Sequence, residues 1–232
     1  MTGQRTISCF VTGTDTGVGK TLVSTALLHA LARHHKHVVG MKPVAAGTTL
    51  IHRSEVNEDV LALRAASTLA VPAALDNPVL LPDAVSPHVA AARAARTIDI
   101  AHIVACHRQL LQLADAVVVE GAGGFLVPLS ASETGADLAQ ALGLPVVLVV
   151  GLRLGCLNHA QLSAEAIRAD GLTLAGWVAN RIDPQMDAVA ENIAWLRARL
   201  GAPLLGELPW LAPLERERIT IDPAAAARRT AP

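Results

Sequence analysis

The residues with the clearest chemical meaning lie near the start of the chain, where residues 13–21 read Gly-Thr-Asp-Thr-Gly-Val-Gly-Lys-Thr. Glycines in such a turn let backbone N–H groups converge on phosphate oxygens, and a helix that begins there adds positive potential. Lys20 would then reach the β- and γ-phosphates of a nucleotide, and the hydroxyl of Thr21 would bind Mg²⁺. The match to GxxxxGK[ST] is imperfect because Thr14 replaces the first glycine. A structural glycine turn is the alternative, but the Gly-Lys-Thr core between an apolar run and a helical pattern favours nucleotide binding.

A phosphate loop needs acidic partners for its metal, and two carboxylates are candidates. Glu120 ends the run Ala-Val-Val-Val-Glu and is followed by Gly-Ala-Gly-Gly, so it occupies the place of a Walker-B carboxylate. Taken alone, this segment could equally be a strand that ends in a solvated turn. Asp59 is the second candidate, although Asn-Glu-Asp before a helical pattern is also typical of a helix cap.

Short β-branched runs alternate with helical patterns, and this alternation predicts the elements that position these residues. Helical spacing is found near residues 22–31, 58–67, 98–114, 159–169 and 187–200. The apolar runs are almost continuous, which is typical of strands buried on both faces of a parallel sheet. The sequence therefore predicts an α/β fold of the P-loop NTPase type, with a doubly wound, mainly parallel sheet, helices on both faces, and ligands at the carboxyl ends of the strands. The predicted strands are Ile7–Thr12, His37–Val44, Ala116–Glu120, Pro145–Gly151, Leu174–Asn180 and Pro203–Leu208.

The chain contains no internal repeat and no linker rich in Pro, Gly or Ser, so we expect a single domain over residues 1–222. The segment Pro72–Pro87 holds four prolines and is interpreted as an irregular excursion. Residues 223–232 are rich in Ala and Arg and are interpreted as a disordered tail. Hydrophobic residues make up 52% of the chain but aromatic ones 2%, so the core must be built from Ala, Val and Leu.

Charge and composition exclude several classes of partner. The formal net charge of −1 gives no electrostatic reason to expect nucleic acid or an anionic membrane. The apolar strings are too short to span a bilayer and the first residues lack a signal-peptide core, so a soluble cytoplasmic protein is expected. The three cysteines form no CxxC and are interpreted as free thiols. The segment His34–His37 is more typical of a solvated helix end than of a metal site, since no Cys or acid cluster lies nearby.

Five further segments carry short motifs beyond the phosphate loop. They read Gly-Met-Lys-Pro-Val (40–44), Glu-Gly-Ala-Gly-Gly (120–124), Gly-Cys-Leu-Asn-His (155–159), Gly-Trp-Val-Ala-Asn (176–180) and Gly-Glu-Leu-Pro-Trp (206–210). Together with residues 13–21 they resemble the dethiobiotin synthetase family, in its order and spacing, over about residues 7–211. The resemblance implies ATP-dependent carboxylation and ring closure of 7,8-diaminononanoate with CO₂ to form dethiobiotin, ADP and phosphate, in biotin biosynthesis. It also implies Mg²⁺ as cofactor and a homodimer with the substrate site near the interface.

The resemblance assigns roles to individual residues. Lys42 and Lys20 are the implied catalytic residues, since a carbamate oxygen that attacks the γ-phosphate needs cations on both sides. The amide of Asn180 can pair with the donor and acceptor edge of adenine. The implied Mg²⁺ ligands are Thr21, Asp59 and Glu120. The implied ATP contacts are Gly17, Val18, Gly19, Lys20, Thr21, Leu22, Asp59, Glu120, Gly121, Ala122, Gly123, Asn180, Arg181, Pro209, Trp210 and Leu211. The implied substrate contacts are Thr16, Lys42, Leu154, Gly155 and Asn158, the last three toward the diamine of the other subunit.

Two positions depart from the family pattern. Ala46 stands where the family often has serine, so it lacks a hydroxyl that would contact the diamine or the carbamate. Arg181 stands where an aspartate is common. We expect these changes to affect substrate affinity and base preference rather than the class of reaction. Without the resemblance, Lys42 would be interpreted as a solvated lysine after a strand, and Asn180 as a turn residue.

Three other classes of protein could carry such a loop. Partitioning or switch ATPases of the deviant P-loop class have a second lysine early in the loop, as in KGGxGK, and the aligned residue here is Asp15. That difference argues against the switch class. A second alternative is another ATP-dependent enzyme that activates an amide or amine, which the Lys-Pro-Val segment at 42–44 disfavours. A binding module without catalysis is hard to reconcile with a complete set of metal and phosphate groups.

Overall fold

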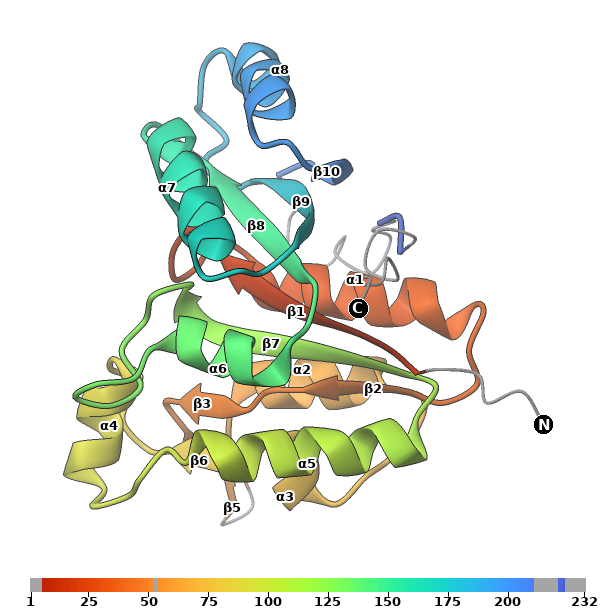
Figure 1. The fold of residues 1–232 in the computed structure, drawn as a ribbon, viewed down its shortest axis with the longest axis vertical. Coiled ribbons are helices and arrows are strands. Elements are labelled where there is room, and N and C mark those ends of the chain that lie inside the picture. The colour runs from red at the N-terminus through yellow and green to blue at the C-terminus, as the bar shows by residue number, and fades with distance from the viewer. Residues whose placement is uncertain (1–5, 52–53, 211–220, 224–232) are drawn as a thin grey trace.

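The computed structural model describes residues 6–51, 54–210 and 221–223. Across these residues, six strands form one sheet in the order β10–β9–β8–β1–β7–β2, and every pairing in it is parallel (Figure 1). The predicted α/β fold with a mainly parallel sheet is therefore confirmed. The strands are β1 (Ile7–Gly13), β2 (Val38–Met41), β7 (Ala116–Gly124), β8 (Val146–Leu152), β9 (Leu174–Arg181) and β10 (Leu204–Leu208).

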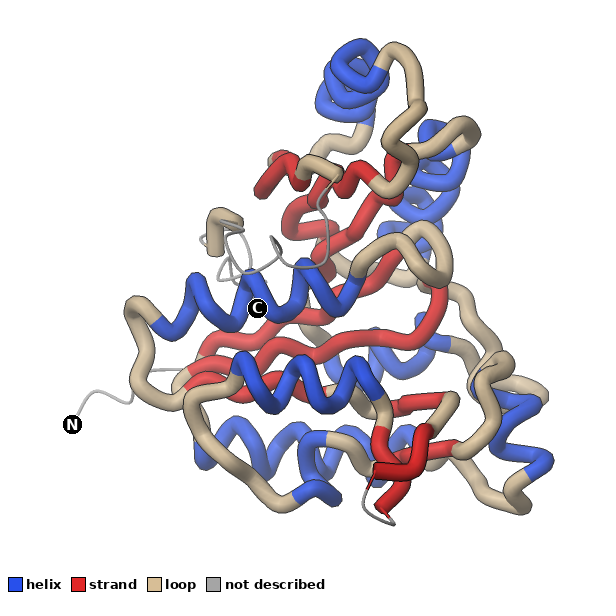
Figure 2. Tube along the Cα trace, turned by 180° about the vertical axis from the view of Figure 1, so that it is seen from behind, coloured by secondary structure: helices blue, strands red, loops and turns tan. Residues whose placement is uncertain are grey.

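Helices cover both faces of this sheet, as Figures 1 and 2 show from opposite sides. One face carries α1 (Lys20–Ala32) and α2 (Glu58–Ala66). The other carries α5 (Ile100–Leu113), α6 (Gly135–Leu142), α7 (Cys156–Ala169) and α8 (Val189–Arg199). Successive residues of a strand point to opposite faces, so in β1 Phe10 packs on the α5–α8 side while Cys9 and Val11 pack on the α1–α2 side. This explains why the strands are apolar without alternation.

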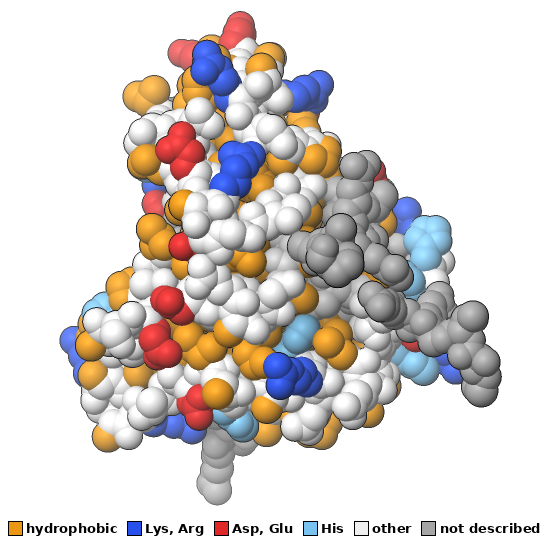
Figure 3. Space-filling model, in the orientation of Figure 1, with side chains coloured by type: hydrophobic (Ala, Val, Ile, Leu, Met, Phe, Trp, Pro, Cys, Tyr) orange, Lys and Arg blue, Asp and Glu red, His pale blue; other side chains and the backbone are white. Residues whose placement is uncertain are grey.

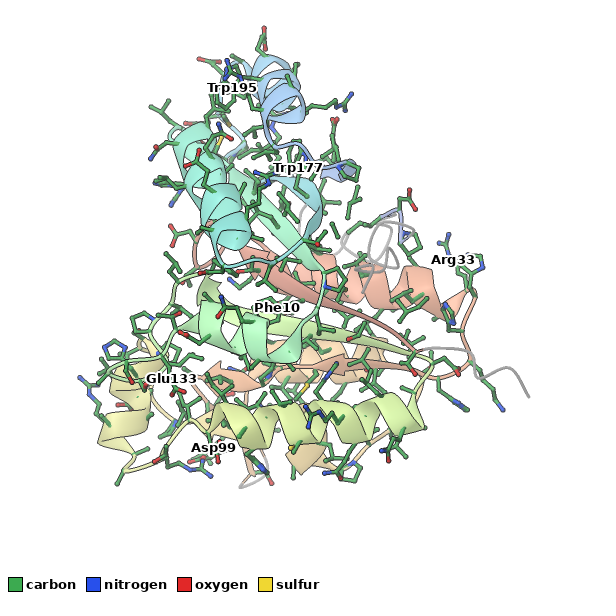
Figure 4. The ribbon with its side chains drawn as sticks, viewed as in Figure 1. Phe10, Arg33, Asp99, Glu133, Trp177 and Trp195 are labelled. Atoms are coloured by element: carbon green, nitrogen blue, oxygen red, sulfur yellow. The ribbon has the colours of Figure 1, made fainter. Side chains whose placement is uncertain are left out.

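Two of the few aromatic side chains lie deepest in the core, whereas Trp195 and Trp210 are exposed. Phe10 is 2% exposed and Trp177 is 0% exposed, and Figure 4 labels both among the side chains that fill the molecule around β1 and β9. The remaining core is Val, Leu, Ile and Ala, as the composition requires. Cys9, Cys106 and Cys156 are buried free thiols, as expected.

The path of the chain through the sheet creates a crevice. From β1 it passes beyond β7 to β2 on one side, and it later passes from β7 across β1 to β8 on the other side. The carboxyl end of β1 is therefore a topological switch point, where ligands bind in sheets of this kind.

The prediction of one strand over His37–Val44 is wrong. Strand β2 ends at Met41, and the chain resumes as β3 (Val44–Ala46), which pairs in parallel with β6 (Val79–Leu81) in a separate small sheet. The break has a local cause, because the Lys42 N–H donates to the Asp76 carbonyl at 2.8 Å and Pro43 has no N–H to donate.

The segment Pro72–Pro87 is also more regular than predicted. It contains α3 (Ala73–Asp76) and β6, and α4 (Pro87–Arg93) begins at its end. Two strands were not anticipated, β4 (Thr49–Ile51) and β5 (Ser54–Val56), which pair antiparallel with each other. Helix α6 was missed as well, although Thr134 and Asp137 form a capping box at its start.

Near the C-terminus, Ile221 is buried in the core beside α1, and Asp222 donates its N–H to the Leu205 carbonyl at 3.1 Å. The single domain over 1–222 stays a prediction, and the expected tail over 223–232 lies outside the described residues from 224 onward. The segment His34–His37 directly follows the end of α1, as expected for a helix end. Within the described segments, none of the helices has the length and apolar character needed to cross a bilayer.

Candidate active site

The phosphate loop joins β1 to α1 at the switch point. Gly17 and Gly19 have φ values of 75° and 92°, a region that L side chains rarely adopt, and Gly19 is the N-cap of α1. Gly19 has a second constraint, because a Cβ there would collide with the amide nitrogen of Asn180. That amide, at the end of β9, donates to the Val18 carbonyl at 2.8 Å. Asn180 therefore fixes the backbone of the loop, and its second N–H and its amide oxygen are left for a ligand.

Lys20 lies at the start of α1 with 7% of its surface exposed. Its Nζ donates to the Asp15 carbonyl at 3.1 Å, which curls the side chain back along the loop. Burial, and then the positive charge of Lys42, lower the pKa of Lys20 to about 8. An ammonium group held in this way gains most from an anionic ligand.

A cluster of one hydroxyl, two carboxylates and one ammonium lies beside Lys20. The Thr21 Oγ1 is 2.7 Å from Asp59 Oδ1 and 3.0 Å from Glu120 Oε1. The Lys42 Nζ is 2.5 Å from Glu120 Oε1, 2.8 Å from Asp59 Oδ2 and 3.2 Å from the Gly121 carbonyl. These residues come from α1, α2, β7 and the end of β2, so the fold brings together four positions spread over about half of the chain.

The charges in this cluster stabilise one another. Burial opposes the charge of Lys42, but Glu120 and Asp59 outweigh it and raise the pKa of Lys42. Burial likewise favours neutral Asp59, but the charge and hydrogen bond of Lys42 hold its pKa below the usual value. The Glu120 side chain is 0% exposed, and a buried ion pair is tolerated when its remaining polar atoms are satisfied.

One atom is not satisfied in this way. Among the described residues, Glu120 Oε2 is buried and has no hydrogen-bond partner. The Thr21 hydroxyl has one proton, so it can donate to one of the two carboxylates at a time. Hard oxygen donors with an unpaired carboxylate oxygen suit Mg²⁺, which typically takes one or two carboxylates and completes its shell with water and phosphate. No group of three or more His, Cys, Asp or Glu in the described segments could hold a metal alone, so Mg²⁺ here would need the hydroxyl and the nucleotide.

The sequence did not reveal what positions Lys42. Its N–H donates to the Asp76 carbonyl at 2.8 Å, and the Asn77 amide donates to its carbonyl at 2.7 Å. Asp76 is in turn held by two hydrogen bonds of 2.6 Å from Arg64 of α2. The backbone of Lys42 is thus clamped from the segment that was predicted to be irregular, and nothing in that segment signalled the contact.

The segment that contains Asp59 does cap a helix, while its metal role stays a prediction. Asn57 is the N-cap of α2, and its side chain accepts from the N–H groups of Asp59 and Val60 at 3.0 and 3.3 Å. Capping is therefore done by Asn57, which leaves the Asp59 carboxylate free to join the cluster.

Two clefts meet at the phosphate loop. The larger, of about 740 Å³, extends from the loop over Lys42 to Ala46 and residues 84–87. The smaller, of about 240 Å³, lies on the other side of the loop. Both are lined by Gly17, Gly19 and Leu22, so one elongated ligand could occupy both. The predicted residues that line the larger cleft are Thr16, Gly17, Gly19, Lys20, Thr21, Leu22, Lys42, Asp59, Ala122 and Gly123, and those that line the smaller one include Asn180, Arg181, Pro209 and Trp210.

Other predicted residues lie elsewhere. Leu154 is 95% exposed, and Gly155 and Asn158 are also exposed at the start of α7, where neither cleft reaches. The chain therefore does not bring these three residues to its own cleft, and their expected contact with the other subunit stays a prediction. Leu211 lies outside the described residues.

Comparisons with known proteins give matches over most of the chain. The AAA domain family matches residues 8–218. The ATP-dependent dethiobiotin synthetase BioD of Janthinobacterium sp. (strain Marseille) is 53% identical over 227 residues, which are 96% of this chain and 93% of that protein.

Solved structures with the same fold include a ParA family ATPase from Chlorobium tepidum TLS, at a TM-score of 0.55 and 13% identity over 91% of this chain and 87% of that one. They also include the cell division protein MinD of Aquifex aeolicus, at a TM-score of 0.52 and 17% identity over 88% and 81%. At these identities the two ATPases support the fold alone.

Fold and site together define a P-loop protein of the nucleotide-binding α/β class. Within that class, the identity over nearly the whole chain shows that this protein belongs to the dethiobiotin synthetase family.

Proposed function

We propose that this protein is an ATP-dependent cyclo-ligase that forms dethiobiotin from 7,8-diaminononanoate, CO₂ and ATP, with release of ADP and phosphate. The observation that carries the proposal is the pair of buried ammonium groups, Lys20 and Lys42, that line one large cleft together with an acidic cluster. A plain nucleotide site needs the first lysine, and a second buried cation in the same cleft can serve a second, anionic reactant. Membership in the family gives that reactant its identity.

In this reaction a carbamate on one amine attacks the γ-phosphorus of ATP, and ADP leaves. The second amine then attacks the carbon of the mixed anhydride, phosphate leaves, and the five-membered urea ring closes. Negative charge gathers on the oxygens between the carbamate and the phosphates, where fixed cations stabilise it without reorganisation. We propose that Lys20 holds the phosphates and that Lys42, over which the larger cleft extends toward Ala46, holds the carbamate oxygen.

The nucleotide would lie across both clefts. Its base would occupy the smaller cleft against Asn180, Arg181 and Trp210, and its phosphates would follow the loop into the larger one. Trp210 is 53% exposed and could stack on the base. The Nε of Arg181 is buried without a partner in the described part of the chain, so this residue has a donor available in the place where the family often has an acid.

Mg²⁺ fits the residues present, and Thr21, Asp59 and Glu120 would hold it. A divalent ion there would neutralise charge on the β- and γ-phosphates during transfer. The chain's own contribution is to hold the two carboxylates together through the Lys42 ammonium, with one oxygen of Glu120 unpaired among the described residues.

We further propose a symmetric homodimer, as in the expectation from the family. Leu154, Leu126 and Leu162 are 95%, 57% and 57% exposed, and hydrophobic side chains are visible on the face covered by α5, α6 and α7 in Figure 3. Exposed large hydrophobic side chains such as these leucines are available for a contact with another protein surface. Light scattering at assay concentration should give twice the mass of the chain, and a monomer would contradict this part. Location in the cytoplasm stays a prediction.

Phosphate release tests the proposed function. With ATP and Mg²⁺ alone the rate should be low, and addition of both diaminononanoate and bicarbonate should raise it together with dethiobiotin, measured by mass spectrometry. Phosphate release that does not depend on the diamine would refute the synthetase function and favour a switch ATPase or a general ATPase. Omission of bicarbonate is the matched control, because it removes one reactant without changing the protein.

A further inference from the structure

Helix α2 contacts Lys42 by two separate routes. In its first turn the Asp59 carboxylate accepts from the Lys42 Nζ at 2.8 Å, a direct contact inside the larger cleft. Further along the helix, Arg64 reaches Lys42 indirectly, through Asp76. Both α2 and α3 pack against β2, the strand that ends just before Lys42, and Figure 1 shows α2 beside this strand. The second route acts on the backbone of Lys42 rather than on its ammonium group.

The first link of this route is a bidentate ion pair. The Arg64 Nε donates to Asp76 Oδ2 and its Nη2 donates to Asp76 Oδ1, both at 2.6 Å. The Asp76 side chain is 4% exposed, and within the described residues the hydrogen bonds to its carboxylate come from Arg64 alone. A buried carboxylate needs such partners, and two parallel N–H donors fix its direction as well as its charge. Arg64 therefore fixes the position of the Asp76 side chain.

The second link runs from Asp76 to the backbone of Lys42. Asp76 is the last residue of α3, a helix of four residues, and a single turn of helix is unstable by itself. Packing on α5 places this turn as a whole, and the ion pair with Arg64 holds the residue at its end. The Asp76 carbonyl accepts from the Lys42 N–H at 2.8 Å, and the adjacent Asn77 amide donates to the Lys42 carbonyl at 2.7 Å. Both backbone groups of Lys42 are thus held from a turn whose end depends on Arg64.

The position of this backbone matters for the ammonium group. A lysine side chain is a long flexible stem, so the place of its charge depends on where the stem begins. The Lys42 Nζ is bound at the other end to β7, at 2.5 Å from Glu120 Oε1 and 3.2 Å from the Gly121 carbonyl. A displacement of about 1 Å at a reacting centre can cost about a hundredfold in rate. A change at Arg64 should therefore be felt at the ammonium group, although it acts there only through Asp76.

We propose that Arg64 and Asp76 are positioning residues for Lys42: Arg64 holds Asp76, and the Asp76 carbonyl holds the backbone from which the Lys42 side chain enters the larger cleft. Neither residue is among the described residues that line the two clefts at the phosphate loop, so neither is placed to contact a reactant. The inference rests on the proposed function and adds two residues to it. The alternative is an ion pair that stabilises the fold without an effect on turnover.

The first test is Arg64→Ala, with kcat from dethiobiotin formation and ATP affinity from calorimetry. The kcat should fall roughly tenfold or more, whereas ATP affinity should be unchanged because the phosphate loop is intact. Rates are taken per mole of protein that binds ATP, below the thermal midpoint of the variant, so unfolded protein does not count as lost turnover. Arg197→Ala is the matched control, since Arg197 of α8 also pairs with a carboxylate, that of Glu207 at 3.0 Å, and lines neither cleft. A normal kcat in Arg64→Ala, or a loss of ATP affinity as large as the loss of kcat, would overturn the proposal.

A double-mutant cycle tests whether Arg64 acts through Lys42. The variant Lys42→Gln has no ammonium group to position, so adding Arg64→Ala to it should cause little further loss of kcat, whereas independent contributions would multiply. If Arg64→Ala does not fold, Arg64→Lys is used in the same cycle, because it keeps a charge opposite Asp76 but loses the fork of two N–H donors. Losses that multiply would show that the ion pair does not act through Lys42 and would refute the positioning role.

A third measurement uses the access of solvent to Arg64. Its side chain is 38% exposed and lines a separate cleft of about 270 Å³, so the space left by Arg64→Ala can be reached from solution. Guanidinium chloride at millimolar concentration should raise the kcat of Arg64→Ala, and sodium chloride at the same concentration should not. An equal response to the two salts would contradict the contact with Asp76. Wild-type protein that forms no dethiobiotin would instead refute the proposed function, so the two failures are distinguishable.

Discussion

Two polar regions at opposite ends of the sheet differ in how their polar side chains are stabilised. At the carboxyl ends of the strands, Lys42, Asp59 and Glu120 are charged, are joined to one another, and leave Glu120 Oε2 without a partner in the described structure. At the start of β1, the Ser8 hydroxyl donates to the Val117 carbonyl at 3.0 Å and lies 3.0 Å from His107 Nε2 of α5. The second region is a neutral pair whose side chains contact each other. The first is a charged cluster in which one carboxylate oxygen, Glu120 Oε2, has no partner among the described residues.

The pKa values follow the same division. Burial, with a small contribution from Arg108, lowers the pKa of His107 to about 4, so its imidazole stays neutral at pH 7. The pKa of Lys42 is raised and that of Asp59 lowered, so both stay charged although burial opposes it. A buried charge costs free energy that a neutral pair does not, and a protein retains one where it has a partner to bind. The difference indicates which end of the sheet performs chemistry.

Glu120→Gln should give the largest effect, because it removes the most buried charge and keeps the volume of the side chain. Dethiobiotin formation should fall by about a hundred- to a thousandfold, the range for one lost electrostatic contact in a transition state. The Mg²⁺ concentration for half-maximal activity should also rise, measured by titration at fixed ATP. The control is Glu133→Gln on the loop before α6, and wild-type turnover in Glu120→Gln would remove the carboxylate from the site.

Lys42→Gln should lower ring closure by roughly a hundredfold or more while ATP binds with nearly normal affinity, because Lys20 still holds the phosphates. Calorimetry for ATP and mass spectrometry for product form the test. Without Lys42 the carboxylates of Asp59 and Glu120 lose the ammonium that joins them, so the variant should melt at a lower temperature than wild type and Mg²⁺ should recover part of the loss.

Lys36→Gln is the control for that variant, since Lys36 is exposed and the chain has one further lysine, Lys20. Loss of ATP affinity in Lys42→Gln would move Lys42 into the nucleotide site. Near-normal product formation would refute its role, and the contrast between the two ends of the sheet would lose its main support.

His107 predicts a stability effect at the other end. Its pKa is about 4 in the folded protein and near 6.5 in the unfolded chain, so between these values the unfolded state binds more protons. Stability from this group is therefore complete above about pH 6.5 and declines toward pH 4, by at most about 3 kcal/mol. Urea unfolding of wild type and His107→Gln from pH 7.5 to 4.5 isolates the contribution of His107 to stability, because the other titrating groups are common to both proteins.

In His107→Gln the free energy of unfolding should decline less between pH 6.5 and 4.5 than it does in wild type. Product formation by this variant at pH 7.5 should equal that of wild type. His34→Gln, at an exposed position after α1, should keep the wild-type slope. An identical slope in His107→Gln and wild type would show that the imidazole is protonated in the folded state, and the two regions would then no longer differ in charge.

The same comparison shows what a sequence can reveal. Lys20, Thr21 and Glu120 stand in short segments whose spacing is dictated by a ligand, so they were found by pattern. The parallel sheet was found because strands buried on both faces leave a continuous apolar signal. Both signals are local in the sequence, and the structure brings Lys20, Thr21 and Glu120 together at the switch point.

The contacts that orient Lys42 are not local. Asp76 and Asn77 act through a backbone carbonyl and an amide across more than thirty residues of chain, and such contacts impose no residue pattern that can be recognised in advance. The small sheet of β3 and β6 was missed for a related reason, since three-residue strands are too short to show a period. The His107–Ser8 pair likewise depends on which face of α5 meets the sheet.

The smallest effect is expected from an ion pair of the phosphate loop that is much more exposed than the pair of Lys42 and Glu120. Asp15 Oδ2 lies 2.5 Å from the Arg153 guanidinium, and the two side chains are 46% and 45% exposed, where water screens the pair and its contribution is at most about 1 kcal/mol. The contacts that shape the loop survive Asp15→Asn: Lys20 bonds to the backbone carbonyl of Asp15, and the side-chain oxygen that accepts from the Thr16 N–H at 2.7 Å is kept in asparagine. Asp15→Asn should therefore change the free energy of unfolding by less than about 1 kcal/mol, with the difference vanishing in 1 M NaCl, and product formation should stay within about twofold of wild type. Arg153→Gln should behave alike, because either change removes the same pair. A tenfold loss of kcat/KM in Asp15→Asn alone would place this carboxylate in the working site and would extend the charged region from the buried cluster to the outer side of the loop.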